Sequence, residues 1–175
     1  MRNIIIHSLR FVFLVLLQTL VLHNINLGDL SPYFNGFLYI LFILMLPYDA
    51  PNWLVLTLSF FIGLCIDLFL DTIGMHASAC VLLAFFRPVI LKMLASRDEY
   101  EFRNKPNIHI MGFSWFLYYA LFAAFLHHLW FYIIEDFRLI SLHIIFLKAL
   151  GSALFTTVLI IISQYLMYRD KKENG

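Results

Sequence analysis

The chain has 175 residues, of which 62% are hydrophobic, 18% aromatic and 13% charged, and its formal net charge is +1. A soluble domain carries roughly 25% charged residues, and a core of this size could not enclose so much apolar surface, which excludes an ordinary water-soluble domain. The basic residues form no patch or stripe suited to nucleic acid, so we expect the bilayer and no nucleic acid as surroundings. The composition predicts one all-α integral membrane domain, 1–175.

Crossing a bilayer takes about 20 largely apolar helical residues. The chain offers about six candidate segments, with approximate bounds 4–25, 33–47, 53–70, 76–94, 111–134 and 142–167. The first is too long for the core of a signal peptide, so we expect it to be retained. The segment 33–47 is short, and it either crosses where the bilayer is thin or re-enters. Residues 96–107 form the longest polar stretch, with room for a short interfacial helix.

The lysine and arginine residues predict the orientation, because these residues collect on the cytoplasmic side. With six crossings, nine of them share the side of both termini and two lie opposite, if the intramembrane Arg87 is left out. The nine are Arg2, Arg10, Lys92, Arg97, Arg103, Lys105, Arg169, Lys171 and Lys172, and the two are Arg138 and Lys148. We therefore expect a multi-pass protein of the cytoplasmic (inner) membrane with both termini cytoplasmic.

Two carboxylates, Asp67 and Asp71, lie four positions apart near the outer end of the third segment, which would place them on one helix face. They form either a cation or proton site or a polar helix end. We favour the polar helix end, because a lone acidic pair lacks the further oxygen ligands of a cation site. In this interpretation Asp67 accepts hydrogen bonds where segments three and four meet, with Ser78 near the right depth. Asp67→Asn should then be nearly tolerated.

Arg87 is expected about 13 Å from Asp67 along the hairpin of segments three and four, too far for an ion pair. We expect its side chain to extend toward the cytoplasmic headgroups beside Lys92. Cys65 and Cys80 lack metal-ligand spacing and are expected to pack as small hydrophobic residues. They lie at similar depth in that hairpin, so a disulfide is conceivable, although burial in lipid disfavours it.

Other polar residues in the apolar segments are Gln18, His127 and His128. Gln18 is expected to donate a hydrogen bond between helices. The two histidines point about 100° apart and do not form a chelate. We interpret them as interfacial residues, with a metal site completed by His143 as the alternative. No catalytic motif is recognisable, so we expect no enzymatic activity and no cofactor.

The segment Gly63–Ala77, GLCIDLFLDTIGMHA, resembles the signature of the rod shape-determining MreD family through Gly63, Asp67, Gly74 and Ala77. Gly63 would permit close helix contact and Gly74 a tight turn. The length, the short second segment, the opening loop and the basic loop after segment four are also similar to that family. Asp71 and Arg87 depart from the pattern.

The resemblance implies a non-enzymatic component of the cell-elongation machinery that helps to organise peptidoglycan synthesis. Its implied partners are the single-span protein MreC and, through it, MreB, RodA and a class B penicillin-binding protein. The implied fold is similar to the substrate-binding subunits of energy-coupling-factor vitamin transporters, and no catalytic residues carry over.

A transporter subunit of that type is the alternative function. It would need an outward cavity lined by polar and aromatic groups. The candidates for that lining are Asp67, Asp71, His76, His127, His128 and Trp130. A membrane enzyme is a third and weaker hypothesis.

Overall fold

The computed structural model describes residues 2–26, 28–94, 106–137 and 141–166, and within these ranges the chain is helical with no strand. Its elements are α1 (Arg2–Leu20), η1 (Leu22–Asn24), η2 (Gly28–Tyr33), α2 (Ile40–Leu44), α3 (Asn52–Leu70), α4 (Met75–Leu94), α5 (Ile108–Met111), α6 (Phe113–Glu135) and α7 (Leu142–Leu166). Most of the predicted interfacial stretch 96–107 lies outside the described residues.

Within the described residues, five helical stretches are long and apolar enough to cross a membrane: His7–Asn24, which begins within α1, and the helices α3, α4, α6 and α7. The all-α fold is therefore confirmed, and the helices are compatible with a multi-pass membrane protein. The bounds of α3, α4, α6 and α7 agree with the predicted segments within two residues. Breakers set these ends, since α3 follows Pro51 and α6 follows Gly112 at a φ of +83°.

The prediction of a sixth spanning helix over 33–47 is wrong. Only Ile40–Leu44 is α-helical there, and the backbone before it is largely irregular. Residues 36–46 are all buried, so this part of the chain lies inside the protein and does not face lipid. Irregular backbone is tolerated at membrane depth when protein surrounds it and satisfies its polar groups. We call residues 35–46 the interior segment.

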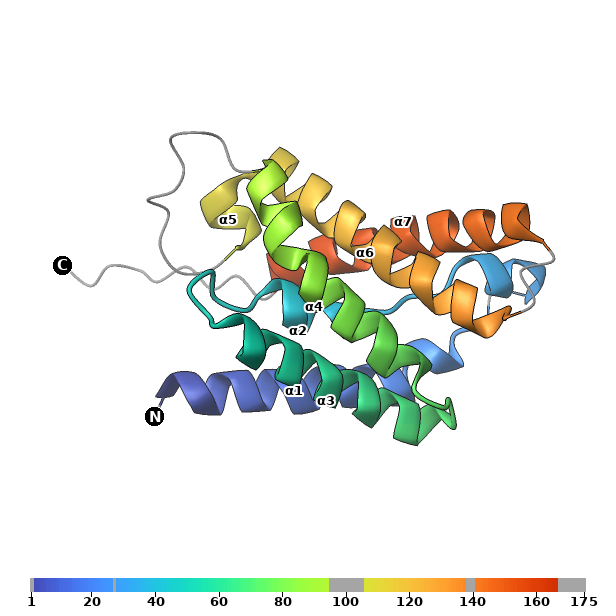
Figure 1. The fold of residues 1–175 in the computed structure, drawn as a ribbon, viewed down its shortest axis with the longest axis horizontal. Coiled ribbons are helices and arrows are strands. Elements are labelled where there is room, and N and C mark those ends of the chain that lie inside the picture. Colours follow the sequence, from blue (N-terminus) through green and yellow to red (C-terminus); the bar gives the residue numbers. More distant parts are fainter. Residues whose placement is uncertain (1, 27, 95–105, 138–140, 167–175) are drawn as a thin grey trace.

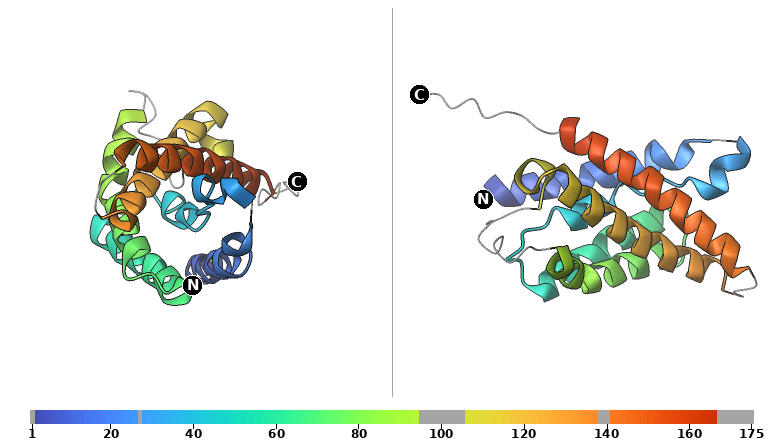
Figure 2. Two further views of the ribbon diagram at one scale, coloured as in Figure 1. Left: turned by 90° about the vertical axis from the view of Figure 1, so that its right-hand side faces the viewer. Right: turned by 90° about the horizontal axis from the view of Figure 1, so that it is seen from above.

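The interior segment runs along the middle of the bundle. Its start contacts α7 at Ser152, and Met45 near its end contacts Gln164, twelve residues farther along that helix. At 1.5 Å per residue this distance is about 18 Å. The long helices lie around the segment (Figure 2), with α3 packed on α4, α4 on α6, α6 on α7 and α1 on α3.

The bundle has two distinct ends (Figure 1). The starts of α1 and α3 and the ends of α4 and α7 lie at one, which we call the N-terminal end. The η2 helix, the α3–α4 turn, the end of α6 and the start of α7 lie at the other, which we call the η2 end. Because the interior segment leads from the η2 end back toward the N-terminal end, the start of α1 and the end of α7 lie at the same end of the bundle.

Small residues are frequent on the buried faces of α4 and α6. The buried residues of this kind are Ala77, Ala79, Ala84, Ala120, Ala123 and Ala124. Such residues let helix backbones approach each other in membrane proteins, where packing and hydrogen bonds replace the hydrophobic effect as the driving force. The core therefore combines closely packed helices, such as α3 and α4 at Gly63 and Ala77, with a segment that is largely non-helical.

Candidate functional site

The turn between α3 and α4 is built around the Asp67 carboxylate, which is 4% exposed. Its Oδ1 accepts hydrogen bonds from the Thr72 hydroxyl at 2.6 Å and the His76 amide at 3.0 Å. Its Oδ2 accepts from the Ala77 amide at 2.8 Å. The carboxylate thus satisfies amides in the first turn of α4, where negative charge is also favoured by the helix dipole. Ser78 is not among these donors, since its hydroxyl bonds to the Met75 carbonyl.

The two glycines at this turn have separate roles. A Cβ on Gly63 would lie 2.5 Å from the Cα of Ala77, so only glycine lets α3 approach α4 this closely here. Gly74 has a φ of +72° and open space around it. Glycine is therefore favoured at this position by the backbone conformation and not by a lack of space. The residues on which the MreD resemblance rests therefore meet at one joint.

Asp71 does not share a helix face with Asp67. The helix α3 ends at Leu70, and Asp71 adopts a left-handed conformation with a φ of +53°. Its side chain is exposed while that of Asp67 is buried against α4. The expected pairing of the two carboxylates is wrong, because the spacing rule holds only while the helix continues.

The backbone of the interior segment is satisfied by polar side chains from the surrounding helices. The Gln18 amide of α1 donates to the Gly36 carbonyl at 2.9 Å and accepts from the Leu38 amide at 3.0 Å. Gln18 therefore donates a hydrogen bond as expected, but to the main chain of the interior segment and not to another helix. It replaces the hydrogen bonds that a regular helix would have made there.

Two hydroxyls of α7 also form hydrogen bonds with the backbone of the interior segment. Ser152 accepts from the Asn35 amide at 3.0 Å, and Thr156 accepts from the Phe37 amide at 3.0 Å. They lie four residues apart on one face of α7. Their spacing within an apolar run was the available signal in the sequence for this contact, and our sequence analysis missed it.

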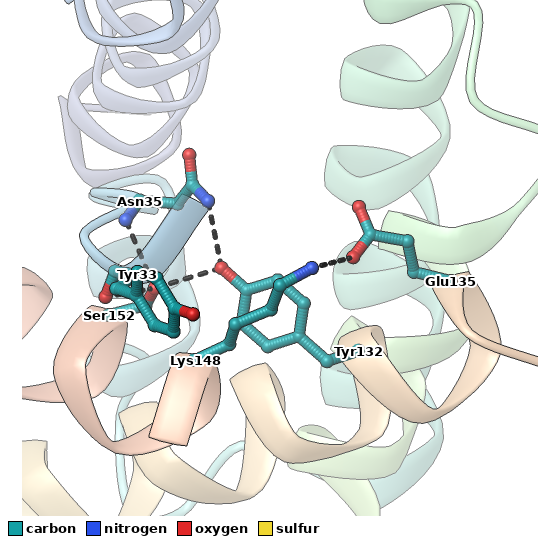
Figure 3. A network of polar contacts seen from close by, with 6 residues as sticks. All are labelled: Tyr33, Asn35, Tyr132, Glu135, Lys148 and Ser152. Atoms are coloured by element: carbon teal, nitrogen blue, oxygen red, sulfur yellow. Dashed lines mark hydrogen bonds and ion pairs between the residues drawn. The ribbon is translucent and has the colours of Figure 1, made fainter. Parts of the chain in front are cut away.

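A polar network anchors the segment at the η2 end (Figure 3). The Asn35 side-chain amide donates to the Tyr132 hydroxyl at 2.8 Å, and that hydroxyl lies 2.8 Å from the Ser152 hydroxyl. Lys148 lies beside the network, 3.6 Å from the Glu135 carboxylate and 5.5 Å from the centre of the Tyr132 ring. The Lys148–Glu135 pair is partly exposed, so it adds little stability by itself.

Three aromatic side chains meet deeper in the core. The Tyr39 hydroxyl lies 2.7 Å from His76 Nδ1 and 3.0 Å from His127 Nε2. Because the hydroxyl has one proton, it donates to one imidazole and accepts from the other. The Cys80 thiol lies 3.8 Å from His127 Nε2, and His127 Nδ1 has no partner. The network joins the interior segment to α4 and α6.

The prediction that His127 and His128 are interfacial is wrong, because both are fully buried. His128 Nδ1 lies 2.8 Å from the Ala124 carbonyl, and its Nε2 lies 3.2 Å from the Asn35 carbonyl. The two rings face the interior segment, and His143 is exposed at the start of α7. Within the described ranges, no group of three or more His, Cys, Asp and Glu side chains is arranged to hold a metal ion. Cys65 and Cys80 are free thiols.

The prediction that Arg87 extends toward the headgroups is also wrong. Its side chain is 3% exposed, with Nε donating to the Tyr119 hydroxyl at 3.0 Å and Nη2 to the Leu46 carbonyl. The Tyr119 hydroxyl donates in turn to the Leu44 carbonyl at 3.3 Å. Leu44 is the last residue of α2 and Leu46 follows two residues later, so Tyr119 donates to the helix end while Arg87 donates and places its positive charge just beyond it.

In the part of the chain that the structure describes, these contacts define a helical bundle with five long apolar helices and a buried, hydrogen-bonded interior segment. Comparison of the chain with models of known protein families, with curated proteins and with solved structures finds no match.

Proposed function

We propose that this chain is a non-enzymatic scaffold of the bacterial cell-elongation machinery, an MreD-like protein of the inner membrane that helps to organise peptidoglycan synthesis. Its direct partner is an MreC-like single-span protein, which links it to MreB, RodA and a class B penicillin-binding protein. The observation that supports this proposal best is the α3–α4 joint. There Gly63 and Ala77 touch, the Asp67 carboxylate holds the start of α4, and Gly74 makes the turn.

The use of the buried polar groups also favours a scaffold. Gln18, Ser152, Thr156 and Arg87 direct their hydrogen bonds at the backbone of the interior segment. A binding or catalytic site would instead present such groups to a ligand. Hydrogen bonds of this kind make a rigid body, which suits a protein that presents a surface to a partner.

The transporter subunit remains the alternative function, and the packing of the core favours it less. The side chains of residues 37–46 fill the space between the helices where an outward cavity would lie. A pocket of about 340 Å³ on α6 and α7 is lined by aliphatic and aromatic side chains apart from Thr157. A vitamin site would need more polar groups than this pocket offers.

The charges of the described residues support an orientation with the N-terminal end in the cytoplasm. Arg10 lies in the first half of α1 and Lys92 in the last turn of α4, so both belong to that half of the bundle. Lys148, near the start of α7, is the basic residue of the η2 half among the lysines and arginines that the structure describes. Basic residues favour the cytoplasmic side of a membrane.

The test is affinity purification of the tagged full-length chain from native membranes in mild detergent, combined with its depletion. We expect an MreC-like protein to co-purify and depleted rod-shaped cells to round or swell. Normal elongation with loss of uptake of a vitamin would refute the scaffold and support the transporter. Asp71→Asn is the matched control variant, because that side chain is exposed, and it should retain the partner.

A further inference from the structure

The turn between α3 and α4 has an unusual distribution of polar and apolar side chains. Ile73 at its tip is 99% exposed, and Leu68 and Phe69 on the last turn of α3 are 73% and 62% exposed. Meanwhile the Thr72 hydroxyl points inward and donates to Asp67. A turn that meets water usually exposes its polar side chains. In this turn the Thr72 hydroxyl is partly covered, whereas Ile73 is exposed beside the exposed Asp71 carboxylate.

The length of α3 explains how this turn could avoid water. Its 19 residues span about 28 Å, slightly less than the roughly 30 Å hydrocarbon core of a bilayer, and any tilt shortens that reach. Trp53 at the opposite end of α3 is 67% exposed, and exposed tryptophan favours the membrane–water interface. With Trp53 at one interface, α3 ends at or below the other.

The neighbouring helices extend farther at the η2 end. The His76 and Phe131 ring centres are 4.6 Å apart, so α4 begins level with Phe131, one turn before Glu135 ends α6. Glu135 pairs with Lys148, and α7 begins six residues, or about 9 Å, before that lysine. The α3–α4 turn is thus recessed relative to the start of α7.

From these observations we infer that the α3–α4 turn inserts into the lipid interface at the η2 end, with Ile73 between the acyl chains near the headgroups. The occupant of this apolar tip is the bilayer itself. Burying a side chain such as isoleucine in an apolar environment is favourable. The turn thereby fixes the depth of the α3–α4 hairpin in the membrane. This inference requires the bundle to span a bilayer, but it is independent of the elongation partners.

Site-directed spin labelling tests the inference on the full chain. A nitroxide is attached at Ile73→Cys in a Cys65→Ser, Cys80→Ala background, and the protein is reconstituted in vesicles of phosphatidylethanolamine and phosphatidylglycerol. Collisions of the label with oxygen, which concentrates in lipid, are compared with collisions with a water-soluble nickel chelate. Phe61→Cys on the lipid-facing side of α3 and Asp29→Cys on η2 are the matched lipid and water controls, since both side chains are exposed.

We expect oxygen collisions to exceed nickel collisions at position 73, with a ratio between those of the two controls. Because Ile73 makes almost no packing contact, the variant should elute like the parent protein in size-exclusion chromatography. Nickel collisions at position 73 equal to those at position 29 would overturn the inference. The apolar tip would then stand in water, where another protein would be the surface that covers it.

Discussion

Replacing Asp67 is the most informative perturbation, because both of its carboxylate oxygens accept hydrogen bonds. Asp67→Leu leaves the His76 and Ala77 amides without an acceptor in a buried position. Each unsatisfied buried donor costs about 1–3 kcal/mol, so the free energy of unfolding should fall by about 2–6 kcal/mol. The Thr72 hydroxyl is only partly buried and is free to turn to another acceptor.

Asp67→Asn separates the structural role from a role for charge. An asparagine oxygen at the Oδ1 position keeps the Thr72 and His76 bonds, but its NH₂ group then faces the Ala77 amide. The loss of one acceptor predicts a destabilisation of about 1–3 kcal/mol. The sequence had suggested near tolerance, and the structure revises this because the second oxygen is also used.

The assay is the unfolding midpoint of the purified protein in detergent, measured beside the amount of co-purified partner. Asp71→Asn is the matched control at the same turn and should stay within about 0.5 kcal/mol of the parent protein. Stability and partner recovery should fall together in the order Asn, then Leu. If Asp67→Asn instead abolishes function in cells while stability and partner recovery stay normal, the charge itself is required and the transporter hypothesis gains support.

Three further predictions follow from the packing and the topology. Gly63→Ala places a Cβ 2.5 Å from a backbone Cα of α4 and should lower the free energy of unfolding by about 1–3 kcal/mol. Gly36→Ala meets the flexible end of a side chain and should lower it less, so equal unfolding midpoints for the two variants would contradict the close approach. Gln18→Leu leaves one amide and one carbonyl of the interior segment unpaired, at about 1–3 kcal/mol each, and an unchanged midpoint would show that they find other partners. In cysteine-free protein, a cysteine at Ser141 should react with an impermeant thiol reagent in intact cells and one at Asn104 should not; labelling at Asn104 would refute the proposed orientation.

The apolar composition predicted the all-α fold, and the breakers predicted the ends of α3, α4, α6 and α7 within two residues. These features are local, because a long apolar run satisfies its own backbone only as a helix in lipid. The α3–α4 turn could also be predicted from the sequence, because the effects of Gly63, Asp67 and Gly74 stay within this one hairpin. The position of Asp71 was misjudged, because the i, i+4 spacing rule was extended one residue past the predicted helix end at residue 70, where the chain has already left the helix.

The interior segment was decided by the tertiary structure alone. Its amides bond to side chains remote in the chain, with Leu38 and Gln18 separated by 20 positions and Phe37 and Thr156 by 119. The same remoteness explains why Arg87 is a buried donor to the Leu46 carbonyl of the interior segment and why His127 faces Tyr39. From the sequence, an apolar run of this length predicts a short spanning helix. The irregular backbone found there is stable only because polar side chains of the surrounding helices pair with its buried amides and carbonyls.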